Sequence, residues 1–110
     1  MSELTGAQKK YLRGLAHGVR PAVQVGVRGL EPTVLTTIDQ ALTARELVKV
    51  HMAGDRDARG DFAERIAAKL QAELVGTIGR MAIFFRRHPD PQRQRVSLPR
   101  GRDPIAAPSD

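Results

Sequence analysis

The stretch AVQVGVRG, residues 22–29, is a short strand pattern that runs into a loop containing two glycines. Val23 and Val25 lie on one side of the predicted strand, and the glycines interrupt it. Pro32 follows and suits the first turn of a helix, because the N–H that proline lacks would have no partner there. A strand, a glycine loop and a helix in this order indicate an α/β unit.

The sequence on either side extends this unit to a whole domain. Thr5 and Gln8 match a capping box, which predicts a helix over residues 6–17. Apolar spacing predicts a second helix from residue 32, alternation predicts a strand over 46–52, and a polar loop over 54–60 precedes a third helix around 62–70. Two strands, 73–78 and 81–86, would form a hairpin. We therefore expect an α/β fold, an α-β-α-β-α-β-β sandwich with a four-stranded mixed sheet packed by helices.

Length and composition limit the class of protein. The chain has 110 residues, no cysteine and a formal net charge of +6, which fits one globular domain. No apolar run exceeds five residues, and the first residues lack the pattern of a signal peptide. We expect a cytoplasmic monomer without membrane contact, because a small secreted domain would usually need disulfides.

The reactive residue types indicate a binding protein and not an enzyme. The three serines, at positions 2, 97 and 109, lie in terminal or proline-rich stretches, where no rigid element would hold a nucleophile. The histidines at 17, 51 and 88 lack the close spacing of metal ligands. Asp61 and Glu64 fit helix capping and a solvated face better than acid–base catalysis. We expect no cofactor and no metal.

Positive charge is concentrated in two blocks. Residues 9–28 hold five bases and no acid, and residues 80–102 hold seven arginines and one acid. Residues 29–79, between them, hold six bases and eight acids. Folding could join the two blocks into one positive surface of the kind that binds phosphate backbones. A merely solvated basic surface is the alternative.

Three constellations are candidates for such a surface. The first is the loop from Gly26 to Gly29, whose backbone could approach a phosphate at a helix N-terminus. The second is the basic side of the first helix, and the third is the group of arginines around the last strand. Together with Arg20, the candidate residues are Lys9, Lys10, Arg13, Arg20, Gly26, Arg28, Gly29, Arg80, Arg86 and Arg87.

Two further patterns favour structural roles. Gly76 and Gly79 repeat the glycine spacing inside a predicted hairpin, where a bulge and a turn explain them better. Phe84 and Phe85 point to opposite faces of a strand, and we expect both to be core residues.

The C-terminal segment differs from the rest in composition: residues 88–110 hold five of the seven prolines. We interpret this segment as a flexible basic tail outside a domain of residues 1–87.

The order of several motifs resembles the CRM domain, which is named for chloroplast RNA splicing and ribosome maturation. The resemblance covers about residues 4–87, and the chain looks like the small stand-alone form of the domain that occurs in bacteria, the YhbY-like family. The motifs are, in order, LTG (4–6), QKKYLR (8–13), LAH (15–17), Pro21, VQVG (23–26), GL (29–30), ID (38–39), ELVKV (46–50), IG (78–79) and IFFRR (83–87).

The resemblance implies an RNA-binding α/β domain similar to the C-terminal domain of translation initiation factor three. It also implies association with precursors of the large ribosomal subunit. The family's glycine loop corresponds to Gly26 to Gly29, and its basic helix carries Lys9, Lys10 and Arg13. Two positions depart from the family: Val27 stands where lysine is common, and Phe85 stands where tyrosine is usual.

The predicted function is therefore RNA binding in ribosome maturation, with ribosomal RNA of large-subunit precursors as the partner. A DNA-associated protein is one alternative, although no helix-turn-helix spacing is evident. The other alternative is a protein–protein adaptor whose basic tail binds acidic partners.

Overall fold

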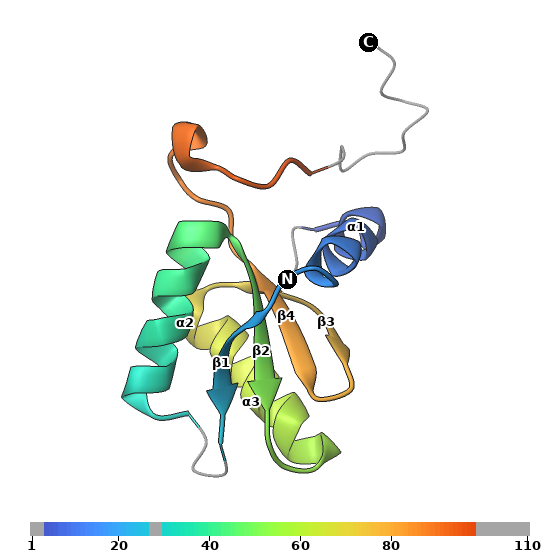
Figure 1. Cartoon of the computed structure of the whole chain (residues 1–110), viewed down its shortest axis with the longest axis vertical. Coiled ribbons are helices and arrows are strands. Elements are labelled where there is room, and N and C mark those ends of the chain that lie inside the picture. Colours follow the sequence, from blue (N-terminus) through green and yellow to red (C-terminus); the bar gives the residue numbers. More distant parts are fainter. Residues whose placement is uncertain (1–3, 27–29, 99–110) are drawn as a thin grey trace.

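The computed structural model describes residues 4–26 and 30–98 (Figure 1). Seven elements follow the predicted order: α1 (Gly6–Ala16), β1 (Pro21–Val25), α2 (Pro32–Arg45), β2 (Leu47–Met52), α3 (Arg56–Leu70), β3 (Glu73–Ile78) and β4 (Met81–Phe85). A short 3₁₀ helix, η1 (Pro91–Arg93), follows them and was not predicted. In this described part, no helix is both long and apolar enough to cross a membrane.

The four strands form one mixed sheet in the order β1-β2-β4-β3. β1 is parallel to β2, whereas β4 is antiparallel to both of its neighbours. The register shifts once in each edge strand, between Pro21 and Val23 in β1 and between Leu74 and Gly76 in β3. The predicted α/β sandwich with a four-stranded mixed sheet is confirmed.

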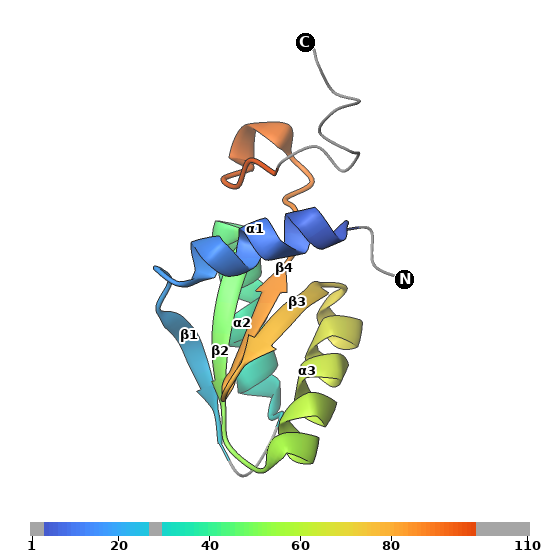
Figure 2. The same cartoon turned by 90° about the vertical axis from the view of Figure 1, so that its right-hand side faces the viewer.

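Helices cover the two faces of the sheet unequally (Figure 2). α2 and α3 pack on one face, over a large core that includes Ile38, Ile66 and Phe84. α1 alone packs on the other face, over a smaller core that includes Leu12 and Phe85. Both phenylalanines are buried, as predicted, and each belongs to a different core because neighbouring strand residues point to opposite faces.

The N-termini of α1 and α3 can be compared with the starts predicted from the sequence. The capping box of α1 is formed: the N–H of Gln8 donates to Thr5 Oγ1 at 3.1 Å, and the N–H of Thr5 donates to Gln8 Oε1 at 3.0 Å. The expected polar loop over 54–60 is wrong, because α3 already begins at Arg56. Asp55 caps it by accepting the N–H of Ala58 at 2.8 Å. The first turns of α3 carry few apolar residues, so periodicity alone does not detect them.

Glu46 connects the domain to the segment that follows residue 87. Its carboxylate is fully buried and accepts the backbone N–H groups of His88 at 2.7 Å, Arg95 at 2.6 Å and Val96 at 2.8 Å. Burial acts to raise the pKa of Glu46. The three N–H donors and the charge of Arg87 outweigh this effect and lower the pKa from its ordinary value of 4.5.

Contacts with the domain therefore continue past the expected boundary at residue 87. Val96 and Leu98 also pack against the smaller core beside α1. The sequence of this segment is poor in apolar residues, and its attachment depends on a buried acceptor that lies more than 40 residues earlier in the chain. The expected tail is described only as far as residue 98.

Candidate nucleic-acid interface

α1 presents a basic surface above the sheet. Its buried side is formed by Gln8, Leu12 and Ala16. Lys10 is exposed and Lys9 is half-buried, and the helix contains no acidic residue. Two lysines without a neighbouring carboxylate on the same helix form a site of positive potential that is open to solvent.

Arg13 extends this surface onto the sheet. Its Nη1 donates to the carbonyl of Val75 at 3.3 Å, and its side chain crosses β3 at Gly76. A Cβ on Gly76 would lie only 2.8 Å from Arg13 Cδ, so glycine makes room for the arginine. The register shift before Gly76 and the positive φ of 59° at Gly79 confirm the interpretation of these glycines as a bulge and a turn.

A second group of candidates lies at the opposite end of the sheet. The N–H of Met52 donates to the carbonyl of Arg80 at 2.8 Å, and Arg80 Nη1 donates to the carbonyl of Gly54 at 3.1 Å. The N–H of Ala53 donates to the carbonyl of Val25, the residue before Gly26. Arg80 and the end of β1, next to Gly26, therefore lie at the same end of the sheet, away from α1.

The glycine loop is described only at its first residue. Gly26 is exposed, and a Cβ added there would meet no described atom within 4 Å. No packing contact within the described residues requires glycine at this position. The candidates Arg28 and Gly29, and the departure at Val27, lie outside the described residues.

The structure separates Arg86 from Arg87. Arg86 donates from Nη1 to Asp39 Oδ1 at 2.7 Å and to the carbonyl of Leu70 at 2.9 Å. Its Nη2 donates to the carbonyl of Asp39 and to Thr43 Oγ1, both at 3.0 Å. The guanidinium therefore joins α2 to the end of α3 from the face of the sheet opposite α1. Sequence reasoning missed this role because Asp39 is 47 residues away.

Arg87 lies on the α1 face and is exposed. Its guanidinium carbon is 6.0 Å from the centre of the Phe85 ring, and Nη1 donates to Gln94 Oε1 at 3.2 Å. Arg20 is also exposed, in the connection between α1 and β1. The exposed cations on or near this face are thus supplied by α1, by the connection that follows it and by the end of β4.

Lys49 is a cation on the α1 face that the candidate list does not include. It pairs in the sheet with Pro21 on β1 and with Ile83 on β4, and it is half-buried. Ile83 belongs to the core beside α1. The sequence already indicated this position of Lys49 through the alternation of residues 46–52, because a lysine between two inward-facing valines must point to the opposite face.

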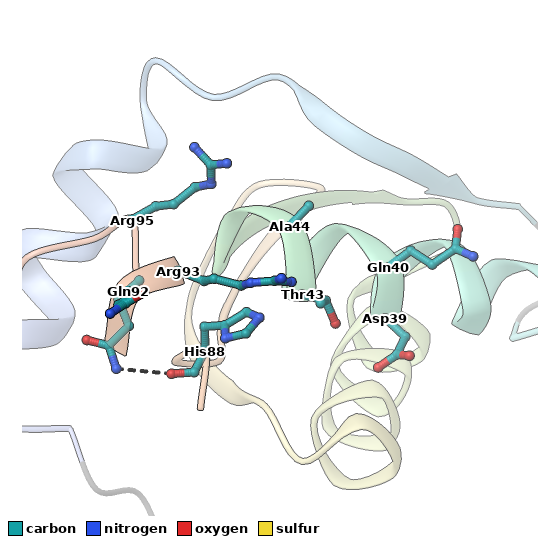
Figure 3. A pocket seen from close by; sticks show the side chains of 9 residues that line it. Asp39, Gln40, Thr43, Ala44, His88, Gln92, Arg93 and Arg95 are labelled. Carbon is teal, nitrogen blue, oxygen red and sulfur yellow. Dashed lines mark hydrogen bonds between the residues drawn. The ribbon is translucent and has the colours of Figure 1, made fainter. Parts of the chain in front are cut away.

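A separate cavity lies between α2 and the segment after β4 (Figure 3). Its volume is about 600 Å³, and it is lined by Asp39, Gln40, Thr43 and Ala44 of α2 together with His88 and residues 92–95. None of the ten candidate residues lines this cavity. It is therefore distinct from the basic surface of α1. No cluster of His, Asp and Glu suitable for a metal ion occurs in residues 4–26 and 30–98.

Comparison with known proteins places the chain in a family. Residues 4–86 match the model of the CRS1/YhbY (CRM) domain. A probable RNA-binding protein of Pseudomonas aeruginosa is 34% identical over 98 residues, which cover 88% of this chain and 94% of the relative. An RNA-binding protein of Haemophilus influenzae is 37% identical over 101 residues, covering 91% and 99%.

A solved structure shows the same fold. The solution structure of a Staphylococcus aureus protein, studied as a candidate RNA-binding protein, superposes with a TM-score of 0.75 at 37% identity. The match covers 87% of this chain and 99% of that protein. Sequence and structure agree that the chain is a member of the CRS1/YhbY (CRM) domain family.

Proposed function

We propose that this protein binds RNA through the basic surface of α1 and that it acts as a maturation factor on the ribosomal RNA of large-subunit precursors. The observation that carries the proposal is α1 itself, which places Lys9, Lys10 and Arg13 on a helix without acids above a partly bare sheet. The names of the relatives support RNA as the ligand, and the resemblance to the CRM domain supports the ribosomal partner.

In the proposed mechanism, the protein positions RNA and does no chemistry on it. Lysine side chains that contact phosphates fix the orientation of a nucleic acid without selecting its sequence, and folded RNA is recognised largely through its shape. The exposed Gly26 would add a backbone contact at the far end of the sheet. A monomeric cytoplasmic protein of this kind would hold a segment of ribosomal RNA in place during assembly.

Charge reversal on α1 tests the RNA surface. We expect the double variant Lys9→Glu, Lys10→Glu to weaken binding of structured ribosomal RNA about tenfold or more. It should also flatten the log–log salt dependence by roughly 1 to 2, because about two phosphate contacts are lost. Fluorescence anisotropy over a salt series measures both effects.

A matched control is available on α3. Arg65→Glu, Lys69→Glu changes the net charge by the same amount at two exposed positions of α3, the helix on the other face of the sheet. This control should lose far less affinity. Equal losses in the two double variants would contradict a specific α1 surface, and unchanged affinity in the α1 variant would remove α1 from the site.

The ribosomal partner is tested in cell extracts. We expect the protein to co-sediment with precursors of the large subunit, as detected with an antibody across a sucrose gradient. Competition with duplex DNA and with an unrelated structured RNA separates a DNA-associated protein from an RNA-binding one. Binding no stronger than that of an unrelated protein with the same number of lysines and arginines would contradict the proposal.

A further inference from the structure

The part of the sheet that α1 leaves bare carries one side chain from each strand in a continuous row. Gln24 pairs with His51, His51 pairs with Met81, and Met81 pairs with Ile78. Paired residues share a face of the sheet. Met52, next to His51, is buried in the core under α2 and α3, so the row lies on the α1 face. We name these four residues the open row.

The open row is partly apolar and accessible. Ile78 is 48% exposed, and Met81 beside it is half-buried. Gln24 is exposed. His51 is half-buried, and its Nδ1 is buried without a hydrogen-bond partner in the described part of the chain. An orphaned nitrogen costs stability, so packing does not explain a histidine at this position.

Cations border the open row on the side of α1. The next row of the sheet carries Lys49 on β2 and, on β3, Gly76 with Arg13 lying across it. These two rows contain no Asp or Glu among the described residues. Among the paired strand residues of this face that the structure describes, the acid is Glu73, which pairs with Phe85 one row further on, at the end that α1 covers.

The open row also connects the two groups of candidate residues. Gln24 is two residues before Gly26, and Ile78 is two residues before Arg80. α1 therefore borders one side of the row, and Gly26 and Arg80 border the other at the far end of the sheet. An extended RNA strand could cross from the lysines of α1 to Arg80 over two rows of the sheet that carry no Asp or Glu among the described residues.

We propose that the open row binds unpaired nucleotides of the RNA that α1 contacts. Bases would lie against Ile78 and Met81, and phosphates would lie near Lys49 and Arg13. This inference rests on the RNA binding proposed above and names the part of the surface that takes a single-stranded segment. Bases inside a duplex are stacked on one another, so only unpaired bases can cover exposed aliphatic side chains.

Two neighbouring substitutions on β3 test the proposal. Ile78→Asp adds a negative charge to the open row. Thr77→Asp adds the same charge one residue away, where the exposed Thr77 pairs with Ala82, a member of the core on the opposite face. The probes are a fluorescein-labelled single-stranded RNA without self-pairing and a blunt RNA duplex of the same length, both measured by anisotropy.

We expect Ile78→Asp to weaken binding of the single-stranded probe about tenfold and binding of the duplex less than about threefold. Thr77→Asp should weaken both less than about threefold, since it contributes only screened long-range charge. Lys49→Gln with Lys69→Gln as its control gives a second, neutralising pair. In that pair, only Lys49→Gln should weaken single-stranded binding.

Equal losses for Ile78→Asp and Thr77→Asp, together with no effect of Lys49→Gln, would overturn the proposal and leave RNA binding by α1 in place. A wild-type protein that binds the duplex but not the single strand would overturn it in the same way. A wild-type protein that binds neither of these probes, nor ribosomal RNA, would overturn the proposed function as well.

Discussion

The two faces of the sheet are built from the same strands but have different properties. The face under α2 and α3 is covered more completely, and its central strand residues, such as Val50 and Phe84, are fully buried. The face under α1 is closed only at one end, where Leu47 and Phe85 are buried, and ends in the open row. Most of the apolar burial that stabilises the fold lies on the face under α2 and α3. Residues on the bare part of the α1 face contribute less to stability, so they can serve binding.

The largest contrast is expected between one residue from each face. Phe84→Ala should lower the free energy of unfolding by about 3 to 5 kcal/mol, because it opens a cavity in the closed core. Ile78→Ala should lower it by less than about 1 kcal/mol, since the side chain is already half exposed. Urea denaturation followed by circular dichroism measures both, and similar losses would refute the contrast.

An intermediate effect on the free energy of unfolding is expected for Glu46, next to the covered end of the α1 face. Glu46→Gln should cost about 1 to 3 kcal/mol, because an amide replaces one of the oxygens that accept the backbone N–H groups of the segment from residue 88 to 96. Glu46→Asp is the companion variant. It keeps the negative charge but has a shorter side chain, so it separates the role of the charge from that of the hydrogen bonds.

The same residue predicts a dependence on pH. The pKa of Glu46 is lowered in the folded protein, so its contribution to stability is fully present above its ordinary value of 4.5 and is lost as the pH falls through the lower folded value. The wild-type protein should therefore lose more stability than Glu46→Gln between about pH 7 and about pH 3. Parallel pH profiles would contradict this role.

The smallest effect on stability is expected at Gly76. Gly76→Ala should change the free energy of unfolding by less than about 1 kcal/mol, because the clash at 2.8 Å involves a flexible side chain, that of Arg13. RNA affinity should fall a few-fold without any change in net charge, since Arg13 moves off the sheet. A double variant with Arg13→Gln tests the mechanism, because the effect of Gly76→Ala should then disappear.

Much of the fold could be predicted from local patterns. The capping box at Thr5, the alternation of residues 46–52 and the glycines of the last hairpin each act within a few residues, and each feature is present in the structure. The basic surface of α1 also follows from helical spacing. The predictions of the capping box, the strand and the hairpin succeeded because the physical cause lies next to the pattern in the sequence.

The rest depends on contacts between distant residues. Arg86 and Arg87 look alike in sequence, yet Arg86 forms a partly buried ion pair with Asp39, whereas Arg87 is exposed. Glu46 looks like an ordinary residue at a strand start, but it has a φ of 67° and holds a segment more than 40 residues away. Neither role has a local signal, because the partner that creates it is brought near only by the fold.

The two register shifts have a consequence for association between molecules. β1 and β3 are the edges of the sheet, and an edge strand with a regular row of free N–H and C=O groups can pair with the edge of another sheet. Here each edge strand is irregular, near Pro21 in β1 and before Gly76 in β3, and such irregularities twist an edge out of line. The sheet can thus be partly exposed to solvent without edge strands that favour pairing with the sheet of a second copy.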